Sequence, residues 1–264
     1  MNFFRYPYKA IYRLSAMVSK KIMGTITHIS TQDAVAALTF DDGPHPEYTP
    51  RLLNILERYR VHATFFMIGK VAQKFPGLVE QVARAGHAIG NHSWDHPSFP
   101  LISGRERRAQ IRACAKAIAP YGLKLFRPPY GHQSIASRLD ALWLGYQVVT
   151  WSLVAYDWLN HDVDQIVSFI VNKIKPGSII LFHDALYDAL EDNYANREPM
   201  LEAVNKLLKQ LGNHFRFITI PELLRHGRPQ RQNWYWKSNP DWLSKLKKQD
   251  IKPLRDRRLN RIMV

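Results

Sequence analysis

Short apolar runs alternate with helix-like stretches along most of this chain, and this alternation limits the fold more than any other feature. The runs have the length of buried strands and fall at 34–40, 62–68, 87–91, 123–127, 146–152, 178–183 and 215–220. Helical spacing of apolar residues marks stretches between them, at 51–60, 104–119, 162–173 and 199–211. Alternation of this kind predicts a parallel sheet covered by helices, as an open doubly wound sheet or a barrel close to the eight-stranded type.

Composition places the chain among globular proteins. Its 264 residues are 46% hydrophobic and 22% charged, enough to bury one large core. The one cysteine, Cys114, excludes an intrachain disulfide and lies on the apolar face of the helix expected at 104–119, so we interpret it as a core residue. No Gly-x-Gly-x-x-Gly follows the first strand, which argues against a dinucleotide site.

The net charge of +15 is concentrated at the two ends of the chain. Residues 1–33 carry five Lys or Arg against Asp33, and residues 227–264 carry eleven against three Asp. We therefore divide the chain into a basic, aromatic N-terminal arm (1–33), a catalytic domain (34–226) and a basic, Trp-containing C-terminal tail (227–264). Such arms favour an anionic membrane surface or an acidic polymer, with nucleic acid a less favoured partner, or they are solvated tails.

The sequence contains no apolar run of the roughly 20 residues that a membrane span needs. Arg13, Lys20 and Lys21 interrupt any signal-peptide core near the start of the chain. We therefore expect neither a cleaved signal nor a transmembrane helix, and a cytoplasmic protein that can lie peripherally at the membrane.

Two adjacent carboxylates, Asp41 and Asp42, end the first catalytic-domain strand and are followed by Gly43-Pro44. Unpaired carboxylates at the end of a buried strand cost several kcal/mol unless a cation accompanies them. They predict either a metal site or a catalytic pair, although Asp-Gly and Gly-Pro also occur in ordinary turns.

Further polar residues follow other strands, and in a parallel barrel these strand ends face one mouth. They are His92 and His96 after the third strand, Arg127 after the fourth, Asp157 beyond the fifth and His183 at the end of the sixth. Two histidines four residues apart would lie on one side of a helical turn. With one aspartate they make a three-ligand hydrolytic metal site, for which zinc is the default and cobalt, nickel or manganese are compatible.

Proton transfer can be assigned to the residues left over. The second aspartate would take a proton from water, and Arg127 would orient that aspartate. His183 would protonate the leaving group, with Asp157 holding its tautomer and charge. The alternative for Arg127 and Asp157 is a plain ion pair under the loops.

Five segments stand in the order found in polysaccharide deacetylases of the NodB-homology type, which the chain resembles over roughly residues 34–225. They are Thr39-Phe40-Asp41-Asp42-Gly43-Pro44, His92-Ser93-Trp94-Asp95-His96, Arg127-Pro128-Pro129-Tyr130-Gly131, Asp157-Trp158 and Leu181-Phe182-His183. The basic arms are not part of the family pattern, and the family is often exported whereas this chain has no evident signal.

The resemblance implies a distorted, TIM-like (β/α)7 barrel and metal-dependent removal of acetyl groups from an N-acetylated amino sugar, by hydrolysis of a linear amide C–N bond. Chitooligosaccharide, peptidoglycan-type and lipid-linked glycans all remain open. By this resemblance Asp41 is the general base, tethered by Arg127, and His183 is the general acid, paired with Asp157.

The resemblance also assigns the ion and the substrate contacts. It implies Asp42, His92 and His96 as metal ligands, and Tyr130 as the donor of a main-chain N–H to the oxyanion. Trp158 and Leu181 would wall the pocket for the acetyl methyl, and Pro128 is a further substrate-binding candidate. Competing hypotheses are a deacylase or deformylase of another amide, and a catalytically idle binding module.

Overall fold

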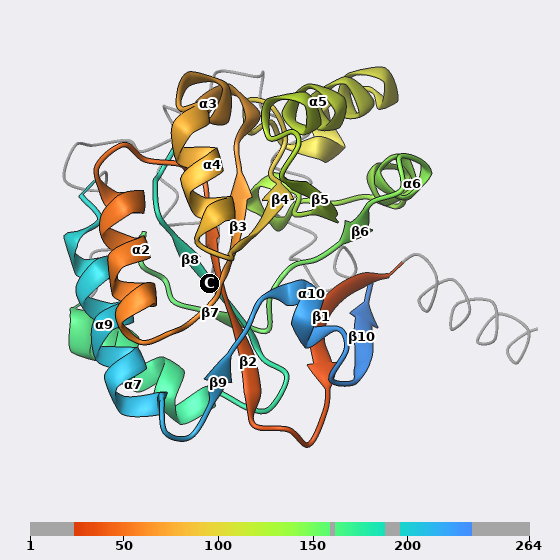
Figure 1. Ribbon diagram of the computed structural model, residues 1–264. Helices are drawn as coiled ribbons and strands as arrows, with labels where there is room; N and C mark the ends of the chain where they lie inside the picture. The colour runs from red at the N-terminus through yellow and green to blue at the C-terminus, as the bar shows by residue number, and fades with distance from the viewer. Residues whose placement is uncertain (1–23, 159–161, 188–195, 234–264) are drawn as a thin grey trace, which may run out of the picture.

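A curled sheet of parallel strands forms the centre of the molecule, with helices around its outer side (Figure 1). The computed structural model describes residues 24–158, 162–187 and 196–233. The strand order is β6-β5-β4-β3-β2-β8-β7, and β9 pairs with β2. The strands are β2 (Val35–Asp41), β3 (Thr64–Met67), β4 (Ala88–Asn91), β5 (Gly122–Phe126), β6 (Gln147–Val148), β7 (Leu153–Val154), β8 (Ile179–His183) and β9 (Arg216–Phe217). This curled sheet confirms the distorted (β/α)7 barrel.

Two predicted strands are much shorter in the structure. The apolar run at 215–220 yields only the two-residue β9, and Ile220 already begins α10 (Ile220–Leu223). The apolar run at 146–152 yields only the two-residue β6, and β7 follows after a break. Between them the Thr150 N–H donates to the Ile26 carbonyl at 2.8 Å, and the Thr150 carbonyl accepts from the Arg127 guanidinium at 2.8 Å. The backbone leaves the sheet ladder here because its polar groups have other partners, which hydropathy does not reveal.

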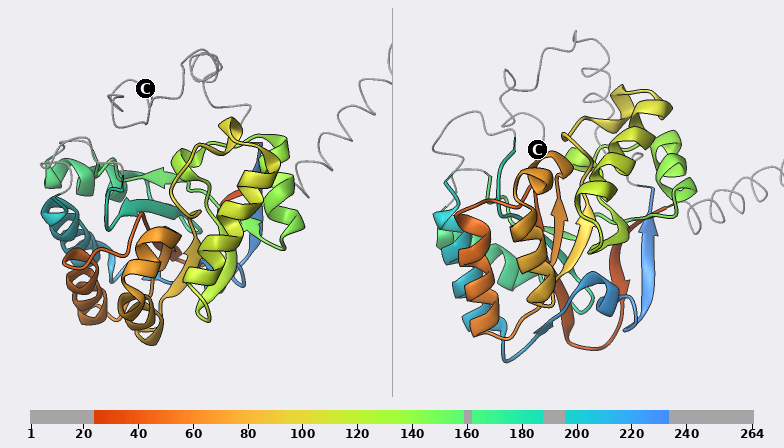
Figure 2. Two further views of the ribbon diagram at one scale, coloured as in Figure 1. Left: turned by 90° about the horizontal axis from the view of Figure 1, so that it is seen from above. Right: turned by 45° about the horizontal axis from the view of Figure 1, so that its top comes forward.

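Helices cover the outer side of the sheet, with α2, α7 and α9 at one end and α5 and α6 at the other (Figures 1 and 2). The helical spacing predicted α2, α5, α7 and α9 to within three residues at each end, whereas the shorter helices were not predicted. The helices are α2 (Tyr48–Arg58), α3 (Gly69–Lys74), α4 (Pro76–Arg84), α5 (Gly104–Ala117), α6 (Ile135–Trp143), α7 (Val163–Lys173), α9 (Glu198–Leu211) and α10 (Ile220–Leu223), with 3-10 turns η1 (Phe99–Leu101) and η2 (Pro129–Gly131).

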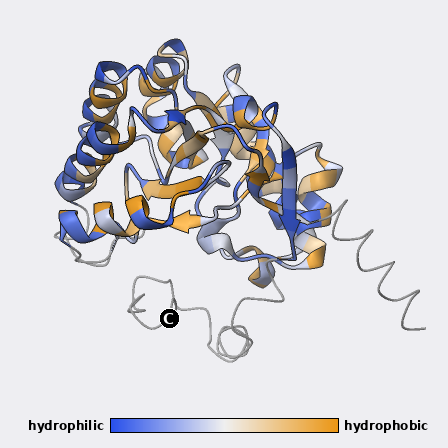
Figure 3. Ribbon diagram, turned by 90° about the horizontal axis from the view of Figure 1, so that it is seen from below, coloured by the Kyte–Doolittle hydropathy of each residue, from blue (hydrophilic) through white to orange (hydrophobic). Residues whose placement is uncertain are grey.

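The main core lies between the sheet and α2, α4, α5, α7 and α9. The outer faces of α2, α7 and α9 are largely hydrophilic (Figure 3). Phe40 stacks on Phe65 with ring centroids 5.2 Å apart and contacts Phe182 at 5.9 Å. Cys114 is fully buried in this core, as predicted, and burial raises the pKa of its thiol to about 12. A neutral thiol in the core packs as a small apolar side chain.

A two-stranded antiparallel ribbon joins β1 (Thr25–Ser30) to β10 (Arg228–Gln232). Both strands come from segments that the sequence assigned to the basic arms. The ribbon lies against the barrel, because Ile26 bridges to Val149 and is fully buried. The remaining parts of the arms, 1–23 and 234–264, lie outside the described residues. None of the described helices is both long and apolar enough to span a bilayer.

Candidate active site

The carboxyl ends of β2, β4, β5 and β8 bring the predicted polar residues to one mouth. Asp41 is the last residue of β2, and it pairs in register with His183 at the end of β8. His92 follows β4 and Arg127 follows β5. Parallel strands align their carboxyl ends, so residues far apart in the sequence meet there.

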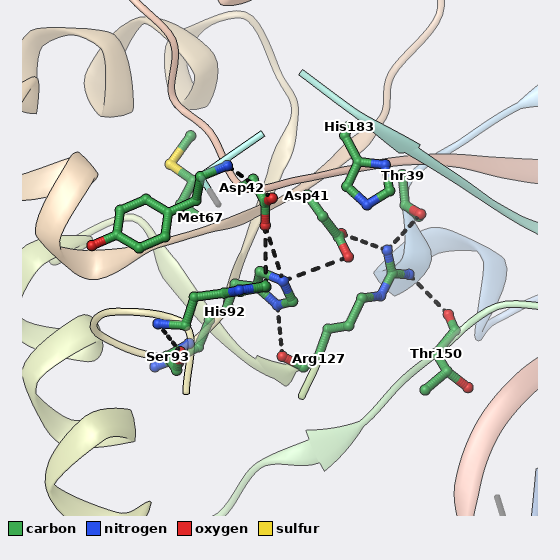
Figure 4. A network of polar contacts seen from close by, with 12 residues as sticks. Thr39, Asp41, Asp42, Met67, His92, Ser93, Arg127, Thr150 and His183 are labelled. Atoms are coloured by element: carbon green, nitrogen blue, oxygen red, sulfur yellow. Dashed lines mark hydrogen bonds and ion pairs between the residues drawn. The ribbon is translucent and has the colours of Figure 1, made fainter. Parts of the chain in front are cut away.

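The three predicted metal ligands form a buried cluster. Asp42 Oδ1 lies 3.4 Å from His92 Nε2 (Figure 4). It also lies 3.4 Å from His96 Nε2. All three side chains are at most 7% exposed. Among the described residues this is the group of His, Cys, Asp and Glu side chains placed to hold a metal ion.

The turn that carries His92 and His96 is not helical, contrary to the helical turn expected from their spacing. Asn91 ends β4, and its side-chain oxygen accepts the Ser93 N–H at 2.9 Å, an Asx-type turn. Ser93 and His96 both have positive φ, at 70° and 62°. The Ser93 hydroxyl then accepts the His96 N–H at 3.1 Å, which closes the loop and directs both rings toward Asp42.

The second oxygen of Asp42 is held by the main chain. The Tyr187 N–H donates to Asp42 Oδ2 at 3.2 Å, which leaves Oδ1 directed at the histidines. Burial by itself raises the pKa of Asp42, but the imidazoles of His96 and His92 outweigh burial, and the net pKa lies well below its usual value. Asp42 is therefore a carboxylate at neutral pH, as a metal ligand must be.

A divalent ion fits this cluster. Asp42 Oδ1 is buried without a hydrogen-bond donor among the described residues. Ligands about 2.1 Å from a tetrahedral zinc ion lie about 3.4 Å from one another, the separation that Oδ1 keeps from both imidazoles. His92 Nδ1–H donates to the Arg127 carbonyl at 2.8 Å, so Nε2 is the nitrogen available to a metal.

Asp41 lies between the Arg127 guanidinium and His92 (Figure 4). Arg127 Nη1 donates to Asp41 Oδ1 at 2.7 Å and to Thr39 Oγ1 at 2.8 Å. Its guanidinium is fully buried over the Phe66 ring, 4.0 Å from the centroid. A buried guanidinium costs several kcal/mol unless it is paired and hydrogen-bonded, and here both conditions are met. Asp41 is thereby fixed with Oδ2 3.8 Å from His92 Nε2.

His183 lies in the same mouth and is held by two charged residues in succession. Its Nδ1 lies 3.0 Å from Asp157 Oδ1, and its main-chain N–H donates to Asp157 Oδ2 at 2.9 Å. Arg197 in turn donates to the Asp157 carbonyl at 2.9 Å and lies 3.4 Å from Oδ2. Burial lowers the pKa of His183, but the Asp157 carboxylate outweighs burial and the net pKa is raised.

The predicted substrate contacts surround this cluster. Tyr130 lies in η2 at φ 56°, and its ring is 4.3 Å from that of His96. Trp158 lies edge-to-face on His183 at 4.9 Å, and Leu181 is buried in a cluster against which Trp158 packs. Pro128 is buried at the start of η2. The structure brings these residues to one place, and their roles stay predictions.

Several residues of the site were not predicted as functional. They are Thr39 beneath Arg127, the Tyr187 N–H on Asp42, and Arg197 behind Asp157. Thr39 begins the segment 39–44 that contributes to the family resemblance. Its place beside Asp41 and Asp42 in that segment was a sequence signal that could have identified it. Arg197 is 40 residues from Asp157 and has no local pattern, so only the tertiary structure reveals it.

Comparisons with known proteins agree with this site. The polysaccharide deacetylase family model matches residues 28–149. A peptidoglycan-N-acetylglucosamine deacetylase of Bacillus cereus is 38% identical over 203 residues, which are 75% of this chain and 92% of the relative. A chitooligosaccharide deacetylase of Azorhizobium caulinodans is 36% identical over 167 residues, which are 62% of this chain and 80% of the relative.

The fold of this chain is also similar to that of a solved structure. The peptidoglycan deacetylase PdaC of Bacillus subtilis superposes with a TM-score of 0.65 at 30% identity, covering 75% of this chain and 93% of PdaC. Sequence, fold and the site at the strand ends therefore agree, and the chain belongs to the polysaccharide deacetylase family.

Proposed function

We propose that this chain removes the acetyl group from N-acetylglucosamine units of a peptidoglycan- or chitin-type glycan, with zinc as the ion. The observation that carries the proposal is the buried Asp42–His92–His96 cluster beside Asp41 and His183. The relatives named for deacetylation of peptidoglycan and of chitooligosaccharides support the substrate class, since both polymers contain N-acetylated sugars.

In this proposal Asp42, His92 and His96 hold the ion. When bound, the ion supplies positive charge that polarises the acetyl carbonyl and acidifies the attacking water. The chain itself contributes the Tyr130 main-chain N–H, which donates to the carbonyl oxygen as negative charge develops there. One such donor is typically worth about 3–4 kcal/mol of the activation barrier.

Asp41 acts as the general base. It accepts a proton from water while the water oxygen bonds to the acetyl carbon. Arg127 holds Asp41 Oδ1 at 2.7 Å, so the other oxygen, Oδ2, is the one free to take the proton.

His183 acts as the general acid. Its Nδ1–H is directed at Asp157, so Nε2–H is the donor left for the departing sugar nitrogen. The C–N bond breaks as the nitrogen takes this proton, and the products are acetate and a free amino sugar. Exchange with solvent then restores the Asp41 carboxylate and the His183 imidazolium.

An acetate-release assay tests the proposal. Purified protein loaded with zinc is given chitin oligomers, peptidoglycan fragments and lipid-linked N-acetyl sugars, with and without chelator. We expect chelator-sensitive release of acetate, and a loss of about 10²–10⁴-fold in Asp41→Asn because a positioned base contributes that much. Metal content, measured separately, stays at the wild-type level because Asp41 is not a proposed ligand.

Asp95 offers a matched control for Asp41. Asp95→Asn changes an exposed carboxylate in the loop of His92 and His96, which accepts from Gln110 at 2.6 Å. We expect this variant to keep full activity. Formyl sugars hydrolysed far faster than acetyl sugars would favour a deformylase. Full activity of Asp41→Asn, or no turnover of any N-acetyl sugar, would overturn the proposal.

A further inference from the structure

Exposed apolar side chains gather on one side of the molecule, on α6. Ile135, Leu139 and Trp143 are 46%, 46% and 70% exposed, and their i, i+4, i+8 spacing aligns them along one face of this helix. We name these three residues the α6 ridge. Single exposed apolar residues are common, whereas a row of them marks an interaction surface.

A row of basic residues on α5 flanks the ridge. Arg105, Arg108, Arg112 and Lys116 share one face of α5 by their spacing. The guanidinium carbons of Arg108 and Arg112 lie 5.5 and 5.6 Å from the centre of the Trp143 ring. The two helices together carry six basic and two acidic residues.

The two acidic residues of these helices are already bonded. Asp140 accepts from Arg107 and Arg108, each at 2.6 Å, and Glu106 belongs to the capping box at the start of α5. They therefore offset only part of the positive charge, and Arg105, Arg112 and Lys116 remain exposed beside the ridge.

The described residues that border the two most basic segments of the chain contact α6 or a residue just before it. Gln133, just before α6, accepts from the Thr25 hydroxyl at 2.6 Å, and Arg138 of α6 donates to Asn233 at 2.5 Å. Thr25 lies two residues after the segment 1–23, which contains five Lys or Arg and no acid. Asn233 lies directly before the segment 234–264, which contains nine Lys or Arg against three Asp.

We propose that the α6 ridge and the basic row of α5 form a docking surface for an anionic lipid bilayer. Apolar side chains that enter the interface, a tryptophan among them, combined with neighbouring cations are what an anionic bilayer recognises. A soluble acidic polymer uses the cations and has no need of the ridge. A second copy of this face would bring two basic rows together, and their repulsion disfavours a dimer through it.

This surface lies close to the mouth of the proposed active site. Tyr130 of η2, whose ring contacts His96, is five residues before Ile135, the first residue of α6. The Ser98 hydroxyl and His132 Nδ1, 3.1 Å apart, tie this connection to the loop after His96. If the proposed function holds, docking on a bilayer would present the mouth to N-acetylated glycan that is attached to, or lies close to, the membrane.

Vesicle co-sedimentation of the full chain tests the surface without depending on catalysis. The probes are vesicles of phosphatidylcholine alone and vesicles that also contain phosphatidylglycerol. We expect binding to the anionic vesicles only, weakening as salt is raised. Leu139→Gln/Trp143→Gln should reduce the affinity at least about 10-fold, because two side chains no longer bury apolar area in the interface. Arg112→Gln should reduce it about five-fold, the effect of one basic residue at an anionic surface.

Phe169→Gln is the matched control, because Phe169 is 39% exposed on α7, at the other end of the molecule (Figure 1). It should bind vesicles as the wild type does, and all the variants should release acetate from soluble chitin oligomers at the wild-type rate. Vesicle binding without any acetate release would contradict the proposed function but would still support the proposed docking surface.

Three outcomes would overturn the proposal. One is the absence of vesicle binding by the wild type. Another is wild-type binding by Leu139→Gln/Trp143→Gln, which would mean that the arms alone hold the bilayer or that another part of the chain covers the ridge. The third is a wild-type dimer in sedimentation velocity that this double variant abolishes, which would make the ridge a contact between copies.

Discussion

At the scale of single residues, each proposed proton-transfer group is fixed by an oppositely charged partner. Arg127 holds Asp41, and Asp157 holds His183. The pairing fixes geometry as well as charge, because each partner occupies one acceptor or donor atom and leaves the other for substrate. Such groups are sensitive to changes in their partners.

Removing the charge of Asp157 should change the pH dependence of the reaction. Burial lowers the pKa of His183 and the Asp157 carboxylate more than compensates. A general acid works while protonated, so activity falls as the pH rises through this raised pKa. In Asp157→Asn the pKa falls, and the alkaline limb of kcat/KM against pH should move to lower pH. Asp164→Asn, on the exposed end of α7, should leave the limb in place, and an unmoved limb in Asp157→Asn would contradict the role of His183.

Arg197 should act as a positioning residue for Asp157. Its side chain is buried and donates to both the main chain and the carboxylate of Asp157. Arg197→Met should lower kcat about 10- to 100-fold, the range for residues that orient a functional side chain from behind, with KM little changed. Steady-state kinetics of acetate release measures both. Arg197→Lys should recover part of the rate, and equal losses in Lys and Met variants would mean that the charge does not matter.

At the scale of elements, the turn after β2 is tightly packed and has little space for a larger side chain. Asp42 has φ 73°, and the next residue, Gly43, packs against the carboxylate of Asp184 from the end of β8. Asp184 also accepts from the Thr49 hydroxyl, and burial raises the pKa of this carboxyl to about 7. The turn is thus fixed between β8 and the first turn of α2.

A single methyl group at Gly43 should therefore disturb the metal site. In Gly43→Ala the new Cβ would overlap the Asp184 carboxylate, so the turn must shift and carry Asp42 with it. We expect zinc affinity, measured by competition with a chromophoric chelator, to fall at least about 10-fold, because metal ligands tolerate small displacements poorly. Gly77→Ala is the control, since nothing lies within 4 Å of its Cβ position. Wild-type affinity in Gly43→Ala would show that the turn adapts.

At the scale of the whole molecule, the proposed metal ligands come from two separate strand ends. Asp42 follows β2, and His92 and His96 belong to the loop after β4, while β8 and the Tyr187 N–H close the other side. An ion bound there would tie these segments together only in the folded state. Binding to the folded state alone raises stability by mass action.

Metal removal should accordingly lower the melting temperature. With free zinc about 1,000-fold above its Kd, binding adds about 4 kcal/mol to the free energy of unfolding. For a chain of this size that corresponds to a shift of roughly 8–16 °C, measured by scanning calorimetry with zinc and with chelator. Asp42→Asn should show little difference between the two conditions. If chelator does not change the melting temperature of the wild type, that result would argue against a metal site formed by these residues.

The sequence by itself determined the parallel sheet, the longer helices and the presence of chemistry at strand ends. Those features depend on local periodicity and on carboxylates, imidazoles and a guanidinium that follow buried strands, and both can be read along the chain. Short elements such as α3, α4 and α6 escaped prediction because a few residues carry too little periodic signal. The resemblance decided which of the two aspartates is the base and which the metal ligand, and it added the substrate contacts. All these roles stay predictions.

Only the tertiary structure decided how the histidines reach Asp42, what stands behind Asp157, and where β1 and β10 belong. The His92–His96 loop depends on an Asx turn and two positive φ angles rather than on a helix. Arg197 meets Asp157, and β1 meets β10, across stretches of chain with no shared pattern. Such pairings are set by which strand ends and chain segments the fold brings into contact, and local residue order does not encode that contact.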